Sequence, residues 1–157
     1  MQPHSPGPDT VATLRPARPD DLPRARRLLQ ACELPTGGVE DQFGPQYVVA
    51  EVEGDIVGLE GIERYGRYGL LRSAAVRDDW RGRGLGEALT RDRLEWATQE
   101  GLEALFLLTT TAGDYFPRFG FRPVERSEVP EEVRRSAEFV GICPASAIAM
   151  RLDLGAR

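Results

Sequence analysis

LLRSAAVRDDWRGRGLG, residues Leu70–Gly86, is the stretch of sequence that decides the fold of this chain. The short apolar run that ends at Val76 predicts a β-strand, and the helical pattern that begins at Leu85 predicts a helix directly after the glycines. The first amides of a helix have no partner within it, and the helix dipole adds partial positive charge there. Strand, glycine loop and helix in this order therefore predict a phosphate-binding turn, where glycine lets an anion approach the backbone.

Two common phosphate loops do not fit these residues. A dinucleotide-binding G-x-G-x-x-G pattern counted from Gly82 would end on Glu87 instead of a glycine. A P-loop requires a lysine, and all 20 basic residues of this chain are arginines. The pattern that fits is Arg81-x-x-Gly84-x-Gly86, and the alternative is an ordinary glycine-rich turn without a ligand.

Composition limits the class of protein further. The 157 residues, of which 41% are hydrophobic and 29% charged, are typical of one globular domain, and the net charge of −5 gives nucleic acid no electrostatic attraction. We expect a Pro/Gly-rich tail at residues 1–9 and the domain at residues 10–154. Because no apolar run reaches membrane-spanning length and no signal peptide opens the chain, we expect a cytoplasmic protein without a membrane partner. A homodimer is left open.

The scarcity of reactive side chains excludes several mechanisms. The only histidine, His4, lies in the tail, and Cys32 and Cys143 are the only cysteines. A Ser-His-Asp triad, a multi-histidine metal site and a lysine Schiff base are therefore excluded, and we expect no metal. Carboxylates, hydroxyls, thiols, water and backbone groups remain, which suits a reaction that positions an already activated donor.

The rest of the chain predicts strands and helices in a mixed α/β order. The expected strands lie at residues 10–15, 47–52, 56–62, 70–76, 104–108, 121–125 and 147–152, and the expected helices at residues 19–32, 85–100, 112–119 and 130–139. The apolar stripe of the second helix is expected to comprise Leu85, Ala88, Leu89, Trp96 and Ala97, whereas Leu94 lies off that stripe. We expect one mixed sheet in a single domain.

Several segments carry a resemblance to a known family. The glycine loop after Ala74-Ala75-Val76 resembles the coenzyme A pyrophosphate loop of the GCN5-related (GNAT) N-acetyltransferases, and Ala112-x-x-x-Phe116-x-x-x-Gly120-Phe121 resembles their second cofactor segment. The LRSxAV strand, the LTTTxxDYF segment and the late P-x-x-V-R…E-F…C-P-x-S stretch are similar to acetyltransferases associated with arsenic-resistance operons. The LRS strand and the late Pro/Arg helix also resemble, more weakly, the acetyltransferase domain of N-acetylglutamate synthases.

This resemblance implies the GNAT acyl-CoA N-acyltransferase fold, with acetyl-CoA as cosubstrate. It implies that a backbone amide near Ala75 and Val76 polarises the thioester carbonyl, and that the loop amides hold the pyrophosphate. Thr109 stands where many relatives touch the pantetheine arm with an asparagine, and a cap on the next helix is the equal alternative. The cofactor-binding residues implied are Ala75, Val76, Arg81, Gly82, Arg83, Gly84, Leu85, Gly86, Glu87, Thr109 and Phe116.

The group that protonates the leaving thiolate departs from the family pattern. Many relatives carry a tyrosine where this chain has Phe116. Tyr115 is one step away on the expected helix, and a rotation of about 100° would aim it elsewhere. Cys143, Ser73 or water is then the candidate acid, unless the enzyme lacks a dedicated one.

Two carboxylates and two arginines are the candidates for work on the acceptor. Glu60 and Glu63 are the candidate bases, and strand alternation places them on opposite faces. We prefer Glu63, which lies nearer the end of its strand, and a solvated carboxylate is the alternative for either. Arg72 interrupts an apolar strand, so it holds a structural carboxylate or binds an anionic group of the acceptor, which we favour. Arg134 on the late helix allows the same two interpretations.

These observations predict direct transfer of an acetyl group from acetyl-CoA to the amine of a small, anionic, amino-acid-like acceptor. The resemblance adds a link to arsenic resistance. The alternatives are an enzyme like N-acetylglutamate synthase, a coenzyme A-binding regulator with little turnover, and a nucleotide-binding protein that uses the same glycine loop.

Overall fold

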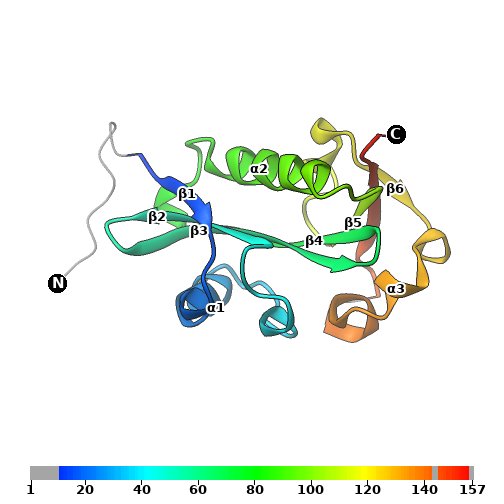
Figure 1. Cartoon of the computed structure of the whole chain (residues 1–157), viewed down its shortest axis with the longest axis horizontal. Helices are drawn as coiled ribbons and strands as arrows, with labels where there is room; N and C mark the ends of the chain where they lie inside the picture. Colours follow the sequence, from blue (N-terminus) through cyan, green and yellow to red (C-terminus); the bar gives the residue numbers. More distant parts are fainter. Residues whose placement is uncertain (1–10, 143–144, 156–157) are drawn as a thin grey trace. The chain divides into compact units, whose positions relative to one another are not determined.

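The computed structural model of the chain describes residues 11–142 and 145–155, and in it helices flank a mixed sheet (Figure 1). The described strands are β1 (Thr13–Pro16), β2 (Tyr47–Val52), β3 (Asp55–Tyr65), β4 (Tyr68–Val76), β5 (Ala104–Thr109), β6 (Arg122–Val124) and β7 (Ile148–Asp153). The described α-helices are α1 (Leu22–Ala31), α2 (Leu85–Gln99) and α3 (Glu131–Arg134). The sheet order is β1-β2-β3-β4-β5-β7-β6, and the expected mixed α/β class is confirmed.

Two compact units make up the described chain. Of the described residues, unit 1 comprises 11–36, 43–61 and 73–93, and unit 2 comprises 37–42, 62–72, 94–142 and 145–155. Strands β3 and β4 and helix α2 each contribute residues to both units.

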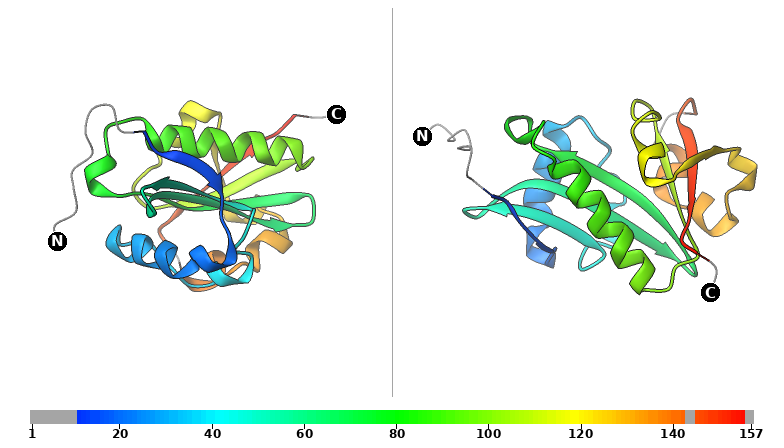
Figure 2. Two further views of the ribbon diagram at one scale, coloured as in Figure 1. Left: turned by 60° about the vertical axis from the view of Figure 1, so that its left-hand side comes forward. Right: turned by 90° about the horizontal axis from the view of Figure 1, so that it is seen from above.

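Unit 1 is built on the antiparallel strands β1, β2 and the first part of β3. Helix α1 covers one face of these strands, and the first half of α2 covers the opposite face (Figures 1 and 2). The core under α2 consists of Val48, Ala50, Val57, Trp80, Leu85 and Leu89. Amphipathic helices thus bury both faces of the strands in this unit.

A buried carboxylate fastens α1 to the strands of unit 1. Asp21 is fully buried and accepts hydrogen bonds of 2.8 and 3.0 Å from Arg15, 2.7 Å from the Arg18 amide and 2.6 Å from Arg24. Arg15 also donates a bond of 2.6 Å to Glu51 on β2. The hydrogen bonds from Arg15 hold the pKa of Asp21 well below its usual range, so this carboxylate stays ionised in the folded protein.

Unit 2 is built around β5, which runs parallel to β4 and antiparallel to β7, while β6 pairs with β7 (Figure 2). Leu105 and Leu107 pack with Phe116, Phe121 and the second half of α2. Ala104 and Phe106 pack on the other face with Val129 and with Val133 of α3. The continuous apolar run of β5 predicts a strand covered on both faces, and this prediction is confirmed.

The buried stripe of α2 differs from the expected one. Ala88 is exposed, because the buried positions fall instead at Leu85, Leu89, Thr90, Arg93 and Ala97. The apolar pattern missed Thr90 and Arg93, which are polar. Leu94, which lies off the expected stripe, packs against the core of unit 2.

Two expected helices are shorter in the structure. The segment expected as a helix at residues 112–119 contains Pro117 and forms only a 3-10 turn, Phe116–Phe119, because proline lacks an amide hydrogen. The helix expected at residues 130–139 is limited to α3. A turn of π-helix, Glu138–Ile142, follows α3, and Gly141 inside it has a φ of +157°.

Replacement of Gly61 by alanine is expected to destabilise unit 1. Gly61 lies opposite Tyr47 in the register of β2 and β3, and a Cβ atom at Gly61 would lie 2.2 Å from the Tyr47 ring. Such overpacking typically costs about 1–3 kcal/mol, so Gly61→Ala should lower the free energy of unfolding in urea by that amount. Gly113→Ala is the control, because a Cβ atom there meets its nearest neighbour at 3.5 Å. Equal stability of the two variants would contradict the packing described here.

Candidate functional site

The glycine loop of unit 1 joins the end of β4 to the start of α2, as the sequence predicts. Gly82 and Gly84 have φ angles of +77° and +82°, and a Cβ atom at either position would meet nothing within 4 Å. Glycine is thus favoured here by backbone conformation and not by crowding. Residues 81–84 are exposed, whereas Leu85 is buried in the core under α2. The exposed loop leads directly into the first turn of α2, whose amides lack partners within the helix.

Arginine side chains surround this loop. The guanidinium of Arg83 lies 4.3 Å from the centre of the Trp80 ring, which keeps its positive charge beside the loop. Arg81 forms an ion pair of 3.1 Å with Asp78 and donates through Nε to the carbonyl of Val76 at 3.3 Å. The positive charge of Arg83 and the dipole of α2 favour an anion at this place.

Strand β4 is irregular just before its end. Ser73 has a φ of +63°, which is uncommon for a residue other than glycine in a strand. After this bend Ala74 is exposed and Ala75 is buried. The residue type of Ser73 gives no sign of the bend, because serine is not a residue that prefers positive φ.

Glu60 lies in the interior of unit 1 and faces α2. Its two carboxyl oxygens lie 2.8 and 3.1 Å from the hydroxyl of Thr90. Burial raises the pKa of Glu60 to about 8, although the Thr90 hydrogen bond and the charge of Arg93 oppose this shift. Glu60 is therefore mainly protonated at neutral pH and joins β3 to α2.

Arg72 lies at the centre of a buried ionic cluster in unit 2. Its Nη1 donates to Oε2 of Glu63 at 3.0 Å, and its Nη2 donates to the Gly37 carbonyl at 3.0 Å. Its Nε lies 3.5 Å from Oε2 of Glu138. The hydroxyl of Tyr65 donates to the other oxygen of Glu63 at 2.6 Å. Arg72 therefore holds carboxylates of the protein itself, as one of its two expected interpretations requires. An acceptor anion, the other interpretation, would have to bind this same guanidinium.

Glu138 is the member of this cluster that the sequence analysis missed. Burial raises its pKa to about 7, against the attraction of Arg72, and the negative charge of Glu63 adds to the rise. The available signal was the E-F pair, Glu138 and Phe139, within the late stretch that carries the family resemblance. A pattern of residue types did not indicate that this glutamate is buried against Arg72.

Other expected site residues lie apart from this cluster. Thr109 accepts a hydrogen bond of 2.9 Å from the Ala112 amide, which matches its interpretation as a cap. Arg134 is exposed on α3, and no interaction recorded among the described residues joins it to Arg72. Cys143 lies outside the described residues.

Phe116 belongs to an aromatic group in the core of unit 2. It is buried, and its ring centre lies 5.8 Å from that of Phe121 and 5.2 Å from that of Tyr115. The guanidinium of Arg118 lies 4.3 Å from the centre of the Tyr115 ring. The position at which the family resemblance implies a proton-donating tyrosine therefore holds a side chain that packs and cannot donate a proton.

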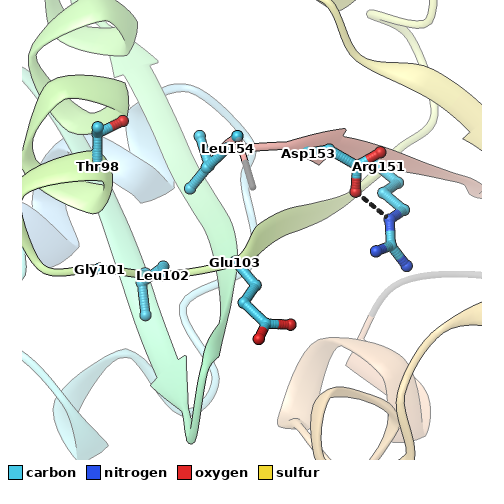
Figure 3. A pocket seen from close by; sticks show the side chains of 8 residues that line it. Thr98, Gly101, Leu102, Glu103, Arg151, Asp153 and Leu154 are labelled. Atoms are coloured by element: carbon cyan, nitrogen blue, oxygen red, sulfur yellow. Dashed lines mark hydrogen bonds and ion pairs between the residues drawn. The ribbon is translucent and has the colours of Figure 1, made fainter. Parts of the chain in front are cut away.

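A hollow of about 570 Å³ lies in unit 2, where β5 begins and β7 ends (Figure 3). Arg151 and Asp153 form an ion pair of 2.8 Å at its wall, and Leu102 and Leu154 supply apolar surface. It shares no lining residue with the glycine loop or the Arg72 cluster. The hollow lies at the beginning of β5, the opposite end of that strand from Thr109. We therefore do not assign the chemistry to it.

The described part of the chain shows neither a metal-binding cluster nor a membrane-spanning helix. Among the described residues, no group of three or more histidine, cysteine, aspartate or glutamate side chains is arranged to hold a metal ion. Within the same part of the chain, no helix combines the length and apolar character needed to span a bilayer.

Comparison with known proteins gives a family and several relatives. The model of the acetyltransferase (GNAT) domain family matches residues 44–123, about half of the chain. An uncharacterised N-acetyltransferase of Chlorobaculum tepidum is 29% identical over 90 residues, which cover 57% of each chain. An amino-acid acetyltransferase of Edwardsiella ictaluri is 39% identical over 66 residues, which cover 42% of this chain and 15% of that protein. The chain thus matches only part of these curated relatives.

Solved structures agree on the fold. N-acetylglutamate synthase from Neisseria gonorrhoeae, complexed with coenzyme A and N-acetyl-glutamate, gives a TM-score of 0.78 at 21% identity, over 94% of this chain and 36% of that chain. A Mycobacterium tuberculosis protein in complex with CoA gives a TM-score of 0.73 at 24% identity, over 90% of this chain and 98% of that chain. The expected fold is confirmed.

Replacement of Glu60 by glutamine is expected to change how stability depends on pH. The folded pKa of about 8 exceeds the ordinary value of 4.5, so the folded state binds the proton more tightly than the unfolded state. Wild-type stability should fall as pH rises from about 4.5 to about 8, and Glu60→Gln should lack this loss. The difference in Tm between Glu60→Gln and wild type should therefore grow in favour of the variant between pH 5 and pH 8.5.

The exposed Glu95 on the same helix provides the control, and Glu95→Gln should follow the wild-type pH profile. Parallel pH profiles for Glu60→Gln and wild type would contradict a protonated Glu60.

Proposed function

The chain belongs to the acetyltransferase (GNAT) domain family, and we propose that it transfers the acetyl group of acetyl-CoA to the amine of a small acceptor. The observation that carries this proposal is the exposed glycine loop, with Gly82 and Gly84 at positive φ, directly before the 15-residue helix α2. Such a helix start binds phosphate, and coenzyme A offers a pyrophosphate. The presence of coenzyme A in two similarly folded structures supports the same ligand.

In this proposal the amides of residues 81–87 hold the pyrophosphate, and a backbone amide near Ala75 or Val76 polarises the thioester carbonyl. Thr109 and Phe116 contribute to the site of the pantetheine arm. Strands β4 and β5 pair only over Tyr68–Leu70 and Ala104–Phe106, although β5 continues to Thr109. The part of β5 that does not pair with β4 supports a place for the pantetheine arm.

The proposed reaction is direct transfer. The acceptor nitrogen attacks the carbonyl carbon, a C–N bond forms, and the C–S bond breaks to release coenzyme A as a thiolate. The amine loses one proton to a base and the thiolate gains one. Glu63 suits the base better than Glu60, because Glu60 is closed in by Thr90 whereas Glu63 shares a cluster with Arg72. Water, Ser73 or Cys143 supplies the proton to the thiolate.

The proposed acceptor is an amino acid that carries a further carboxylate or a similar oxyanion. Arg72, with its planar guanidinium, is the side chain proposed to bind that group, and Arg134 on the exposed face of α3 is a weaker candidate. The relatives named amino-acid acetyltransferases support an amino acid as the acceptor. Glutamate and an arsenic-containing analogue are the two acceptors proposed within this class.

One observation favours a second candidate function. Phe116 is buried among aromatic rings and offers no proton to a leaving thiolate. A coenzyme A-binding regulator with little turnover would need no such proton donor. Release of free thiol with an amine substrate separates the enzyme from the regulator.

Acetyl-CoA is expected to stabilise the protein, whereas ATP and NAD are not. Saturation at 100 times the Kd adds about 2.7 kcal/mol, which is a rise in Tm of several degrees in a thermal-shift assay. A coenzyme A-release screen over amino acids, their phosphinic and arsenic analogues, polyamines and peptides should then be led by acidic amino acids or their analogues. Equal stabilisation by NAD would contradict the family's cofactor, and a lead by polyamines would contradict the anionic acceptor.

Replacement of Gly84 by valine is expected to weaken coenzyme A binding. A β-branched residue at a φ of +82° is strained, so the loop must shift and its amides leave the pyrophosphate. We expect the Kd for coenzyme A, measured by calorimetry, to rise by about tenfold or more, because this strain amounts to 1–3 kcal/mol.

The matched control is Gly66→Val in the turn between β3 and β4. Gly66 has a φ of +65°, and a Cβ atom there also meets nothing within 4 Å. This variant should carry similar strain and keep the wild-type Kd. An unchanged Kd in folded Gly84→Val would remove the loop from the coenzyme A site.

A further inference from the structure

The Arg72 cluster contains more negative than positive side chains. The side chains of Arg72, Glu63 and Glu138 are 0%, 2% and 6% exposed. With both glutamates ionised, one guanidinium faces two carboxylates away from water. Excess buried charge of this kind is unfavourable unless one carboxylate is protonated or leaves.

The two carboxylates are not held equally. Glu63 receives a hydrogen bond of 3.0 Å from Arg72 and one of 2.6 Å from Tyr65. Glu138 lies 3.5 Å from Nε of Arg72, which is longer than an ordinary hydrogen bond between a guanidinium and a carboxylate. Among the described residues, this ion pair is the only polar side-chain contact recorded for Glu138. Glu138 is therefore the partner that Arg72 can exchange at the lower cost.

We propose that Glu138 occupies the place on Arg72 that the carboxylate of the acceptor takes, so that the acceptor binds by displacing Glu138. This inference rests on the proposed function and names the chemical class of acceptor, an amine that carries a free carboxylate. Glu138 then sets acceptor affinity, because every acceptor must compete with it.

The balance of charge favours this exchange. A ligand carboxylate that replaces Glu138 leaves the charge of the cluster unchanged, and Glu138 regains water when it turns outward. The incoming carboxylate can approach Nε of Arg72 to an ordinary charge-assisted hydrogen-bond distance, in place of the contact of 3.5 Å that Glu138 makes there. An acceptor without a carboxylate gains nothing from this exchange, because it offers Arg72 no negative charge in place of Glu138.

The segment that carries Glu138 is suited to movement of this side chain. Glu138 begins the π-helical turn, and the Val140 amide donates to the Ser136 carbonyl at 3.0 Å. These backbone bonds do not involve the Glu138 carboxylate, so the side chain can rotate while the turn stays intact.

The exchange is also expected to depend on pH. The charged groups around Glu138 are Arg72 from β4 and Glu63 from β3. Tyr65 donates a hydrogen bond to Glu63. A Cβ atom at Gly38 would lie 3.6 Å from Arg72 and also 3.6 Å from Asp41, so Asp41 belongs to the same neighbourhood. Because the pKa of Glu138 is raised to about 7, it becomes neutral as pH falls below that value. When Glu138 turns into water, its pKa returns toward the ordinary value of 4.5, so ligand binding releases the proton of a protonated Glu138. A ligand carboxylate should therefore bind more tightly at pH 8 than at pH 6.

The test measures binding of two probes, L-glutamate and glutarate, to the full chain saturated with coenzyme A. Calorimetry with coenzyme A instead of acetyl-CoA prevents turnover. Glu138→Ala should lower the Kd of both probes by about tenfold and abolish the difference between pH 6 and pH 8, because the competing carboxylate is gone. Glu138→Gln, which keeps the side-chain volume and cannot ionise, should also abolish the difference between pH 6 and pH 8, and it serves if the alanine variant does not fold.

The matched control is Glu132→Ala, which removes an exposed glutamate of α3 and should leave both Kd values as in the wild type. Probe binding that is unchanged or weaker in Glu138→Ala overturns the inference, as does a pH difference that persists in Glu138→Gln or absence of probe binding in every variant. If coenzyme A still raises the Tm in those cases, the proposed function stands and only the displacement fails. If coenzyme A itself does not bind, the proposed function fails first.

Discussion

The burial of one positive charge, that of Arg72, constrains much of unit 2. A guanidinium placed in the middle of an apolar strand must find partners inside the protein, because water does not reach it. The partners come from segments far apart in sequence: Glu63 from β3, the Gly37 carbonyl from the loop after α1, and Glu138 from the turn after α3. The loop and the late turn therefore pack beside Arg72, because each supplies it with an acceptor. Gly38 shows how closely they pack, since a Cβ atom there would lie 2.8 Å from Ala137.

Three buried ionisable groups in this protein are stabilised in three different ways. Asp21 is surrounded by arginines and remains ionised. Glu60 has a hydroxyl as its nearest partner, and burial keeps it protonated at neutral pH. Arg72 forms ion pairs with two carboxylates, and the contact with Glu138, at 3.5 Å, is the longer of the two. Asp21 and Glu60 each have short hydrogen bonds from the protein. Arg72 has one weakly held partner, Glu138, which the proposed ligand carboxylate would replace.

Strand β4 carries several of the residues to which the proposed chemistry is assigned. It carries Arg72, then the positive φ of Ser73, then the strand end that leads into the glycine loop. Backbone strain at a residue such as Ser73 costs about 1–3 kcal/mol and persists only where the surrounding structure enforces it. The same strand thus holds the proposed acceptor anchor and the backbone groups proposed to act on the thioester.

The order of elements, the mixed α/β class, the phosphate-type loop and the buried position of β5 were all determined by the sequence itself, because they rest on local periodicity and on glycine. Opposite faces for Glu60 and Glu63 followed from strand alternation alone, and their contacts with Thr90 and Arg72 agree with it. The lengths of the helices around Pro117 and Gly141 were less predictable, since tertiary packing decides whether a short helix continues. Which carboxylates neutralise Arg72, which of them is loosely bound, and which polar residues of α2 are buried were decided only by the tertiary structure. Burial and charge pairing depend on segments that meet through folding, and no spacing along the chain records that meeting.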